Sequence, residues 1–124
     1  MTVLLDSSGW IELLGGSSRA GLFEPALTSS RLLVPSLVRY EVGRYVLAKS
    51  GNEARLLALR AMAKFDQVPI DADTADAAAV IAAKHKLAMA DALIYATAKI
   101  HEAELWTQDA HFENLSGVRF FSKT

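Results

Sequence analysis

Short apolar runs alternate with longer segments of helical periodicity along this chain, and this alternation limits the folds it can adopt. The apolar runs have the length of buried strands and comprise Val3 to Leu5, Leu32 to Val34, Leu105 to Thr107 and Val118 to Phe121. Helices are predicted between them, from Ser7 or Ser8 to about Leu14, Ser36 to about Lys49, Asn52 to Phe65, Thr74 to about Lys86 and about Ala90 to Ile100. Strands separated by helices indicate an α/β fold with a mostly parallel central sheet flanked by helices.

Serine and glycine residues mark several expected helix boundaries. Ser7 or Ser8 can cap the first helix and Ser36 the second, because a serine hydroxyl accepts a hydrogen bond from a free amide of the first turn. The pair Gly15-Gly16 is expected to end the first helix, since glycine adopts the left-handed conformation common at helix ends.

Length and composition narrow the class of protein. The chain has 124 residues, so we expect one domain over residues 1–124, and its 52% hydrophobic content is enough to build a core. It contains no cysteine, which excludes disulfides, thiolate zinc sites and cysteine nucleophiles. No segment approaches the roughly 20 apolar residues of a membrane span, and we expect a cytoplasmic protein with no membrane partner. A formal charge of -1 argues against a broad basic surface, but bound cations could supply positive potential locally.

Two aspartates follow predicted strands directly or nearly so. Asp6 comes after the run Val3 to Leu5, and Asp109 lies two residues beyond Thr107. Ligand sites in parallel α/β sheets lie beyond the carboxyl ends of the strands, so both positions are candidates for function. The alternative is structural, because aspartate is common in turns, where its side chain hydrogen-bonds the local backbone.

Glu41 lies on the predicted helix that begins at Ser36, where a helical wheel surrounds it with apolar neighbours. These neighbours are Leu37, Val38, Tyr45 and Ala48. A carboxylate on an apolar face is costly to desolvate unless it is paired, protonated or bound to a metal. Arg44, three residues further on, offers a salt bridge as the alternative explanation.

Asp91 is the only charged residue between Leu87 and Ala98, in a segment that is apolar almost all round and therefore expected to be a buried helix. Its place near the amino end of that helix allows a structural interpretation, in which the carboxylate caps the helix or complements its dipole.

The case for a functional role is stronger for the four acids together than for each one alone, because all of them could meet at one end of the sheet. Two unit charges about 4 Å apart repel by about 4 kcal/mol at an effective dielectric near 20, so such a cluster requires cations or bound protons. Ligand sets of oxygen atoms alone favour Mg²⁺ or Mn²⁺. These ions support hydrolysis of phosphodiesters, which indicates a nuclease.

Around these acids the sequence resembles the PIN-domain family, and most closely the VapC-like toxins of toxin–antitoxin pairs. The resemblance covers nearly the whole chain and rests on the order and spacing of four fragments: residues 3–8 (VLLDSS), 34–42 (VPSLVRYEV), 87–98 (LAMADALIYATA) and 105–112 (LWTQDAHF). Similar chains commonly carry glycine before the third fragment, whereas this one has His85-Lys86-Leu87, which places the local turn in question.

The resemblance implies a set of roles for the site residues. Asp6, Glu41 and Asp91 would be the principal acids, with Asp109 a fourth that binds metal directly or through water. Ser8 and Thr107 would provide polar support. The implied reaction is metal-dependent hydrolysis of RNA by water, leaving a 5′-phosphate and a 3′-hydroxyl without a covalent intermediate. The implied partners are an RNA substrate, a cognate antitoxin and a second copy of the chain in a homodimer.

Other polar residues receive weaker assignments. His85, His101 and His111 lack the spacing of a two-histidine metal site, and we interpret them as structural or solvent-facing. Arg44 is a candidate contact for RNA phosphate, with a salt bridge as the alternative.

Two other functions fit parts of the sequence. A phosphate-accepting receiver domain has similar length and binds Mg²⁺, but it would need adjacent acids after its first strand, where this chain has Ser7-Ser8 following Asp6. A PIN-like interaction module without turnover is the second alternative, in which the acids act only as structural caps.

Overall fold

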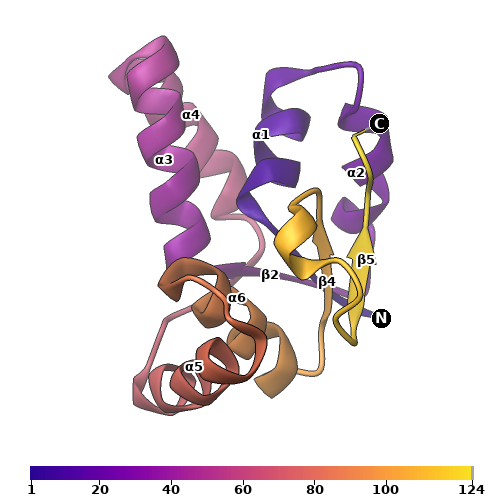
Figure 1. Cartoon of the computed structure of the whole chain (residues 1–124). Coiled ribbons are helices and arrows are strands. Elements are labelled where there is room, and N and C mark those ends of the chain that lie inside the picture. The colour runs from indigo at the N-terminus through magenta and orange to yellow at the C-terminus, as the bar shows by residue number, and fades with distance from the viewer. Residues whose placement is uncertain (124) are drawn as a thin grey trace.

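A five-stranded sheet forms the centre of the computed structural model, which describes residues 1–123 (Figure 1). Its strands are β1 (Thr2–Leu5), β2 (Arg31–Pro35), β3 (Asp66–Val68), β4 (Glu104–Thr107) and β5 (Val118–Phe120). All neighbouring strands are parallel, in the order β3-β2-β1-β4-β5. The prediction of a mostly parallel α/β sheet is therefore confirmed. The order differs from the 2-1-3-4-5 order of flavodoxin-like receiver domains, which removes the receiver alternative.

Six α-helices cover this sheet on both faces. They are α1 (Ser7–Gly15), α2 (Ala20–Leu27), α3 (Ser36–Ser50), α4 (Asn52–Met62), α5 (Ala72–His85) and α6 (Met89–Ile100), and a short 3₁₀ helix, η1 (Ala110–Phe112), follows β4. Helices α1 to α4 lie on one side of the sheet, and α5 and α6 lie on the other (Figure 1). No helix within residues 1–123 combines the length and the apolar character needed to cross a membrane.

The central strand β1 has no solvent-exposed side chain after its first residue. Val3, Leu4 and Leu5 are fully buried, as expected for a parallel strand covered by helices on both faces. Its register with β4 aligns Leu5 with Trp106, and the Asp6 amide donates to the Trp106 carbonyl at 3.0 Å. The strand pairing therefore continues to Asp6, at the carboxyl end of the sheet.

The helix boundaries follow capping chemistry that differs in part from the prediction. Gly16 adopts a left-handed conformation at the end of α1, as predicted for the glycine pair. Asp6 caps α1 in place of Ser7 or Ser8, because its carboxylate accepts from the Ser7 amide at 2.8 Å. Ser36 is the first residue of α3, and its hydroxyl accepts from the Ile70 amide at 3.2 Å instead of capping the helix.

Three elements were not predicted from the sequence, namely α2, β3 and the short 3₁₀ helix η1. Helix α2 contains Pro25, which removes one backbone donor, but its Phe23 and Ala26 are fully buried in the core. Strand β3 has three residues, of which Asp66 and Gln67 are polar, so it lacks an apolar run. Helix α4 ends at Met62, earlier than the predicted Phe65, and β3 begins at Asp66.

Lys86, in the segment that precedes the third fragment, ends α5 in the left-handed conformation with φ 55° and ψ 43°. This conformation costs an L-residue about 1–2 kcal/mol because Cβ crowds the following carbonyl. The turn after α5 therefore forms without a glycine, and Lys86 adopts a backbone conformation that favours glycine.

Replacing Lys86 with glycine should relieve this crowding and raise the free energy of unfolding by about 0.5–1 kcal/mol, after the greater flexibility of unfolded glycine is deducted. The matched control is Lys84→Gly in the last turn of the same helix, which should lower stability by up to about 1 kcal/mol. Urea denaturation of the three proteins checks both values, and equal losses in both variants would contradict the strain at Lys86.

Candidate metal-binding site

Asp6 lies at the carboxyl end of the central strand and is 5% exposed. One carboxylate oxygen accepts from the Ser7 amide at 2.8 Å, and the other accepts from the Thr107 hydroxyl at 2.8 Å. The Thr107 hydroxyl also accepts from the Asp109 amide at 3.0 Å. Thr107 therefore forms hydrogen bonds to two of the candidate acids, and its support of a metal site stays a prediction.

Glu41 projects from the second turn of α3 and is half-buried. Its Oε1 atom is buried and has no hydrogen-bond partner among residues 1–123. The predicted alternative, a salt bridge to Arg44, does not form within the described residues, and Arg44 is exposed. A buried carboxylate oxygen without a donor is costly, so Glu41 Oε1 calls for a partner that residues 1–123 do not supply.

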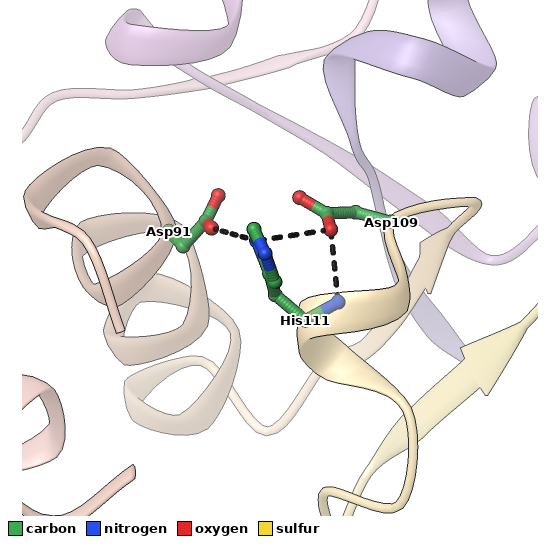
Figure 2. A group of neighbouring side chains, drawn as sticks. All are labelled: Asp91, Asp109 and His111. Carbon is green, nitrogen blue, oxygen red and sulfur yellow. Dashed lines mark hydrogen bonds and ion pairs between the residues drawn. The ribbon is translucent and has the colours of Figure 1, made fainter. Parts of the chain in front are cut away.

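Asp91 and Asp109 face each other across His111, as Figure 2 shows. The His111 Nδ1 atom lies 3.4 Å from Asp91 Oδ2 and 3.3 Å from Asp109 Oδ1. Asp91 is in the first turn of α6 but does not cap it, because Ala88 holds the capping position without a side-chain bond. Asp109 caps η1 by accepting from the His111 amide at 2.9 Å. Capping therefore explains Asp109 in part and does not explain Asp91, whose place in the first turn of α6 still fits the alternative that it complements the helix dipole.

Burial is the main cause of raised pKa values at three of the four acids. It raises the pKa of Asp6, and hydrogen bonds from Thr107 and Ser7 oppose the shift. It also raises the pKa of Glu41, with the Asp6 charge as the next cause. The pKa of Asp91 is raised by burial and then by the Asp109 charge, against the opposing effect of His111.

The charges of the four carboxylates affect one another, although among the described residues only Asp91 and Asp109 belong to a group of three, with His111, whose ligand atoms lie within 4.8 Å of one another. Asp91 and Asp109 contribute to the raised pKa of both Asp6 and Glu41. Such mutual repulsion favours protons or cations in the space between the carboxylates. The oxygen donors and the unpartnered Glu41 Oε1 fit a divalent metal ion, which would offset both the repulsion and the missing hydrogen bond.

Two serines follow Asp6 at the start of α1, and only one of them was predicted to support the site. The Ser8 hydroxyl is buried but has no hydrogen-bond partner among residues 1–123, so its support for the acids stays a prediction. Ser7, which was predicted only as a possible helix cap, contacts the acids: its hydroxyl lies 3.5 Å from Asp6 Oδ1, and its hydrogen bond lowers the pKa of Glu41.

His111 is the site residue that the sequence interpretation left outside the cluster. Its side chain is 75% exposed, in agreement with a solvent-facing residue, but its Nδ1 atom contacts two of the acids. The available signal was its position two residues after Asp109 in a turn beyond a strand.

The chain belongs to the PIN-domain family, because the family model for the PIN domain matches residues 3–118. Its structure is similar to a toxin–antitoxin complex from Klebsiella pneumoniae, with a TM-score of 0.81 and 25% identity over 94% of this chain and 95% of that chain. It is also similar to VapC20 of Mycobacterium tuberculosis, described as a toxin that cleaves the sarcin–ricin loop, with a TM-score of 0.76 and 18% identity over 92% of this chain and 95% of that chain. VapBC2 from Rickettsia felis, bound to promoter DNA, has a TM-score of 0.79 and 14% identity over 98% of this chain and 100% of that chain. No curated protein matches the chain.

Replacing Glu41 with glutamine should stabilise the metal-free protein at pH 7. Because the pKa of Glu41 is raised in the folded state, its contribution to stability is fully present below the ordinary value of 4.5 and is lost as the pH rises through the folded-state pKa. Glutamine removes this loss, so the advantage of Glu41→Gln should be greatest at neutral pH and should shrink on acidification.

Urea denaturation in EDTA at several pH values measures this advantage. Glu53→Gln provides the control, since Glu53 is an exposed carboxylate in the first turn of α4. A Glu41→Gln protein that is less stable than the wild type at pH 7 would show that the carboxylate has a structural partner.

Proposed function

We propose that this chain is a metal-dependent endoribonuclease that acts as the toxin of a toxin–antitoxin pair. One observation carries the proposal: Asp91 and Asp109 lie close enough to share one ion, and their charges also raise the pKa values of Asp6 and Glu41. Membership of the PIN-domain family supports the same reaction class.

Asp6, Glu41, Asp91 and Asp109 are the residues that would hold Mg²⁺ or Mn²⁺. When bound, such an ion supplies an activated water and neutralises charge on the phosphate. The chain itself provides the orientation: the Thr107 hydroxyl and the Ser7 amide each hold one oxygen of the Asp6 carboxylate. The proposed hydrolysis leaves a 5′-phosphate and a 3′-hydroxyl and uses no side chain as nucleophile.

The net charge of -1 gives no support for an RNA substrate, but the positive charges are concentrated in one part of the chain. Residues 36–64, which include α3 and α4, carry six of the 13 Lys and Arg residues but two of the 14 Asp and Glu residues. Arg39, Arg44 and Arg55 line one groove of about 580 Å³ between these helices. Arg44 has no hydrogen-bond or ion-pair partner within residues 1–123, whereas Arg39 and Arg55 both donate to neighbouring groups. Arg44 is therefore available for RNA phosphate, beside the turn that carries Glu41.

An antitoxin and a second copy of the chain complete the proposal. The similar structures include toxin–antitoxin complexes, which supports a protein inhibitor for this chain. Helices α3 and α4 also expose large apolar side chains that a partner could cover, namely Tyr40, Tyr45, Leu47, Leu56 and Leu57.

Purified protein with Mg²⁺ or Mn²⁺ should cut total cellular RNA into discrete fragments, and EDTA should abolish cleavage. Asp91→Asn should reduce the rate by at least about 100-fold, because it removes a charge that the metal requires. The matched control is Asp73→Asn, which changes an exposed aspartate in the first turn of α5 and should leave cleavage unchanged.

Both variants should first be shown to unfold at temperatures close to that of the wild type. Equal cleavage by wild type, Asp91→Asn and EDTA-treated protein would indicate a contaminating ribonuclease. Cleavage that persists in a folded Asp91→Asn protein purified to constant specific activity would contradict the role of the acid cluster.

The toxin role predicts an effect in cells. Expression of the wild-type chain should arrest growth of a bacterial host because its RNA is degraded, whereas Asp91→Asn should permit growth at equal protein levels. Co-expression of a small DNA-binding protein from the neighbouring reading frame should relieve the arrest. Growth arrest by Asp91→Asn equal to that of the wild type would instead favour the interaction module without turnover.

A further inference from the structure

The imidazole of His111 lies between two of the four acids, and the proposed reaction does not use it. Its Nδ1 atom is 3.4 Å from Asp91 Oδ2 and 3.3 Å from Asp109 Oδ1, and Figure 2 shows the ring between the two carboxylates. One ligand atom from each of these three residues lies within 4.8 Å of the other two. His111 is also 75% exposed, so burial does not explain its position.

The backbone determines where this imidazole lies. The turn from Thr107 to His111 is held by hydrogen bonds from the Asp109 amide to the Thr107 hydroxyl and from the His111 amide to Asp109 Oδ1. Phe112, the next residue, is fully buried and donates its amide to the Asp109 carbonyl at 3.1 Å. The start of the His111 side chain is therefore attached to a turn that is anchored in the core.

These distances match the spacing of ligands around one ion. Two neighbouring ligands of an octahedral ion, each about 2.1 Å from the metal, lie about 3 Å apart. The two separations from His111 Nδ1, 3.3 and 3.4 Å, are close to this value, and the ligand atoms of Asp91 and Asp109 lie within 4.8 Å of each other. Asp6 lies outside this group of three, and hydrogen bonds to both of its carboxylate oxygens fix its orientation.

We propose that His111 Nδ1 is a nitrogen ligand of the metal ion held by Asp91 and Asp109. This inference rests on the proposed function, and it changes the chemistry of the site from oxygen ligands alone to a mixed set. Imidazole suits transition metals, whereas Mg²⁺ prefers carboxylate, carbonyl and water oxygens. The site should therefore prefer Mn²⁺ to Mg²⁺ more strongly than the four carboxylates alone would.

Binding of Mn²⁺ by the full chain tests the proposal without any measurement of activity. Pulsed electron paramagnetic resonance should detect a nitrogen coupled to the bound Mn²⁺ in the wild type, and ¹⁵N labelling of histidine should change that signal. His111→Gln should abolish the signal and weaken Mn²⁺ binding by about tenfold or more, with a smaller loss for Mg²⁺ measured by calorimetry.

Two further variants serve as controls. His101→Gln removes another histidine, at the end of α6, and should keep the nitrogen signal and the Mn²⁺ affinity. Asp91→Asn should weaken the binding of both ions. Because His111 is mostly exposed, its replacement is expected to preserve the fold, which thermal unfolding of each variant checks.

The outcomes separate the two proposals. Mn²⁺ that binds in an Asp91-dependent manner without a histidine nitrogen signal would overturn the ligand assignment and leave the metal-dependent nuclease in place. A nitrogen signal that persists in His111→Gln would also overturn the assignment. Absence of Mn²⁺ binding by the wild type would overturn both the metal dependence and the role of His111.

Discussion

The hydrogen bond between Asp6 and Thr107 connects the hydrophobic core of this protein to its candidate site. It joins the residue after β1 to the last residue of β4, and both residues are buried. Because β1 and β4 are parallel, their carboxyl ends lie side by side, and the register that pairs Leu5 with Trp106 brings these two polar residues together. The same Thr107 hydroxyl positions Asp109, so the sheet register determines where two of the four acids lie.

The four acids keep an arrangement that is unfavourable in the absence of a cation. Burial raises the pKa of Asp6, Glu41 and Asp91, and each of these carboxylates is affected by the charge of at least one other acid. A fold optimised only for stability would replace such groups with neutral or apolar ones. Groups of this kind are typical of functional sites, where they are retained at a cost in stability.

Much of the fold could be predicted because its signals are local. Buried runs such as Val3 to Leu5 and the apolar segment around Asp91 identify themselves by composition and periodicity. Helix α2 and strand β3 escaped prediction for an equally local reason, since Pro25 weakens one pattern and two polar residues interrupt the other. Their formation depends on packing in the folded protein, as the complete burial of Phe23 shows.

The sequence by itself determined the α/β class, the family, and the four candidate acids, two of them beyond predicted strands and two on apolar helix segments. It could not determine which side chains contact one another, because periodicity describes one element at a time. Only the tertiary structure placed His111 between Asp91 and Asp109. It also separated Arg44 from Glu41, and it left Glu41 Oε1 with no hydrogen-bond partner among residues 1–123. The physical reason is that these contacts join segments far apart in the chain, and strand register together with helix packing across the sheet sets the distances between them.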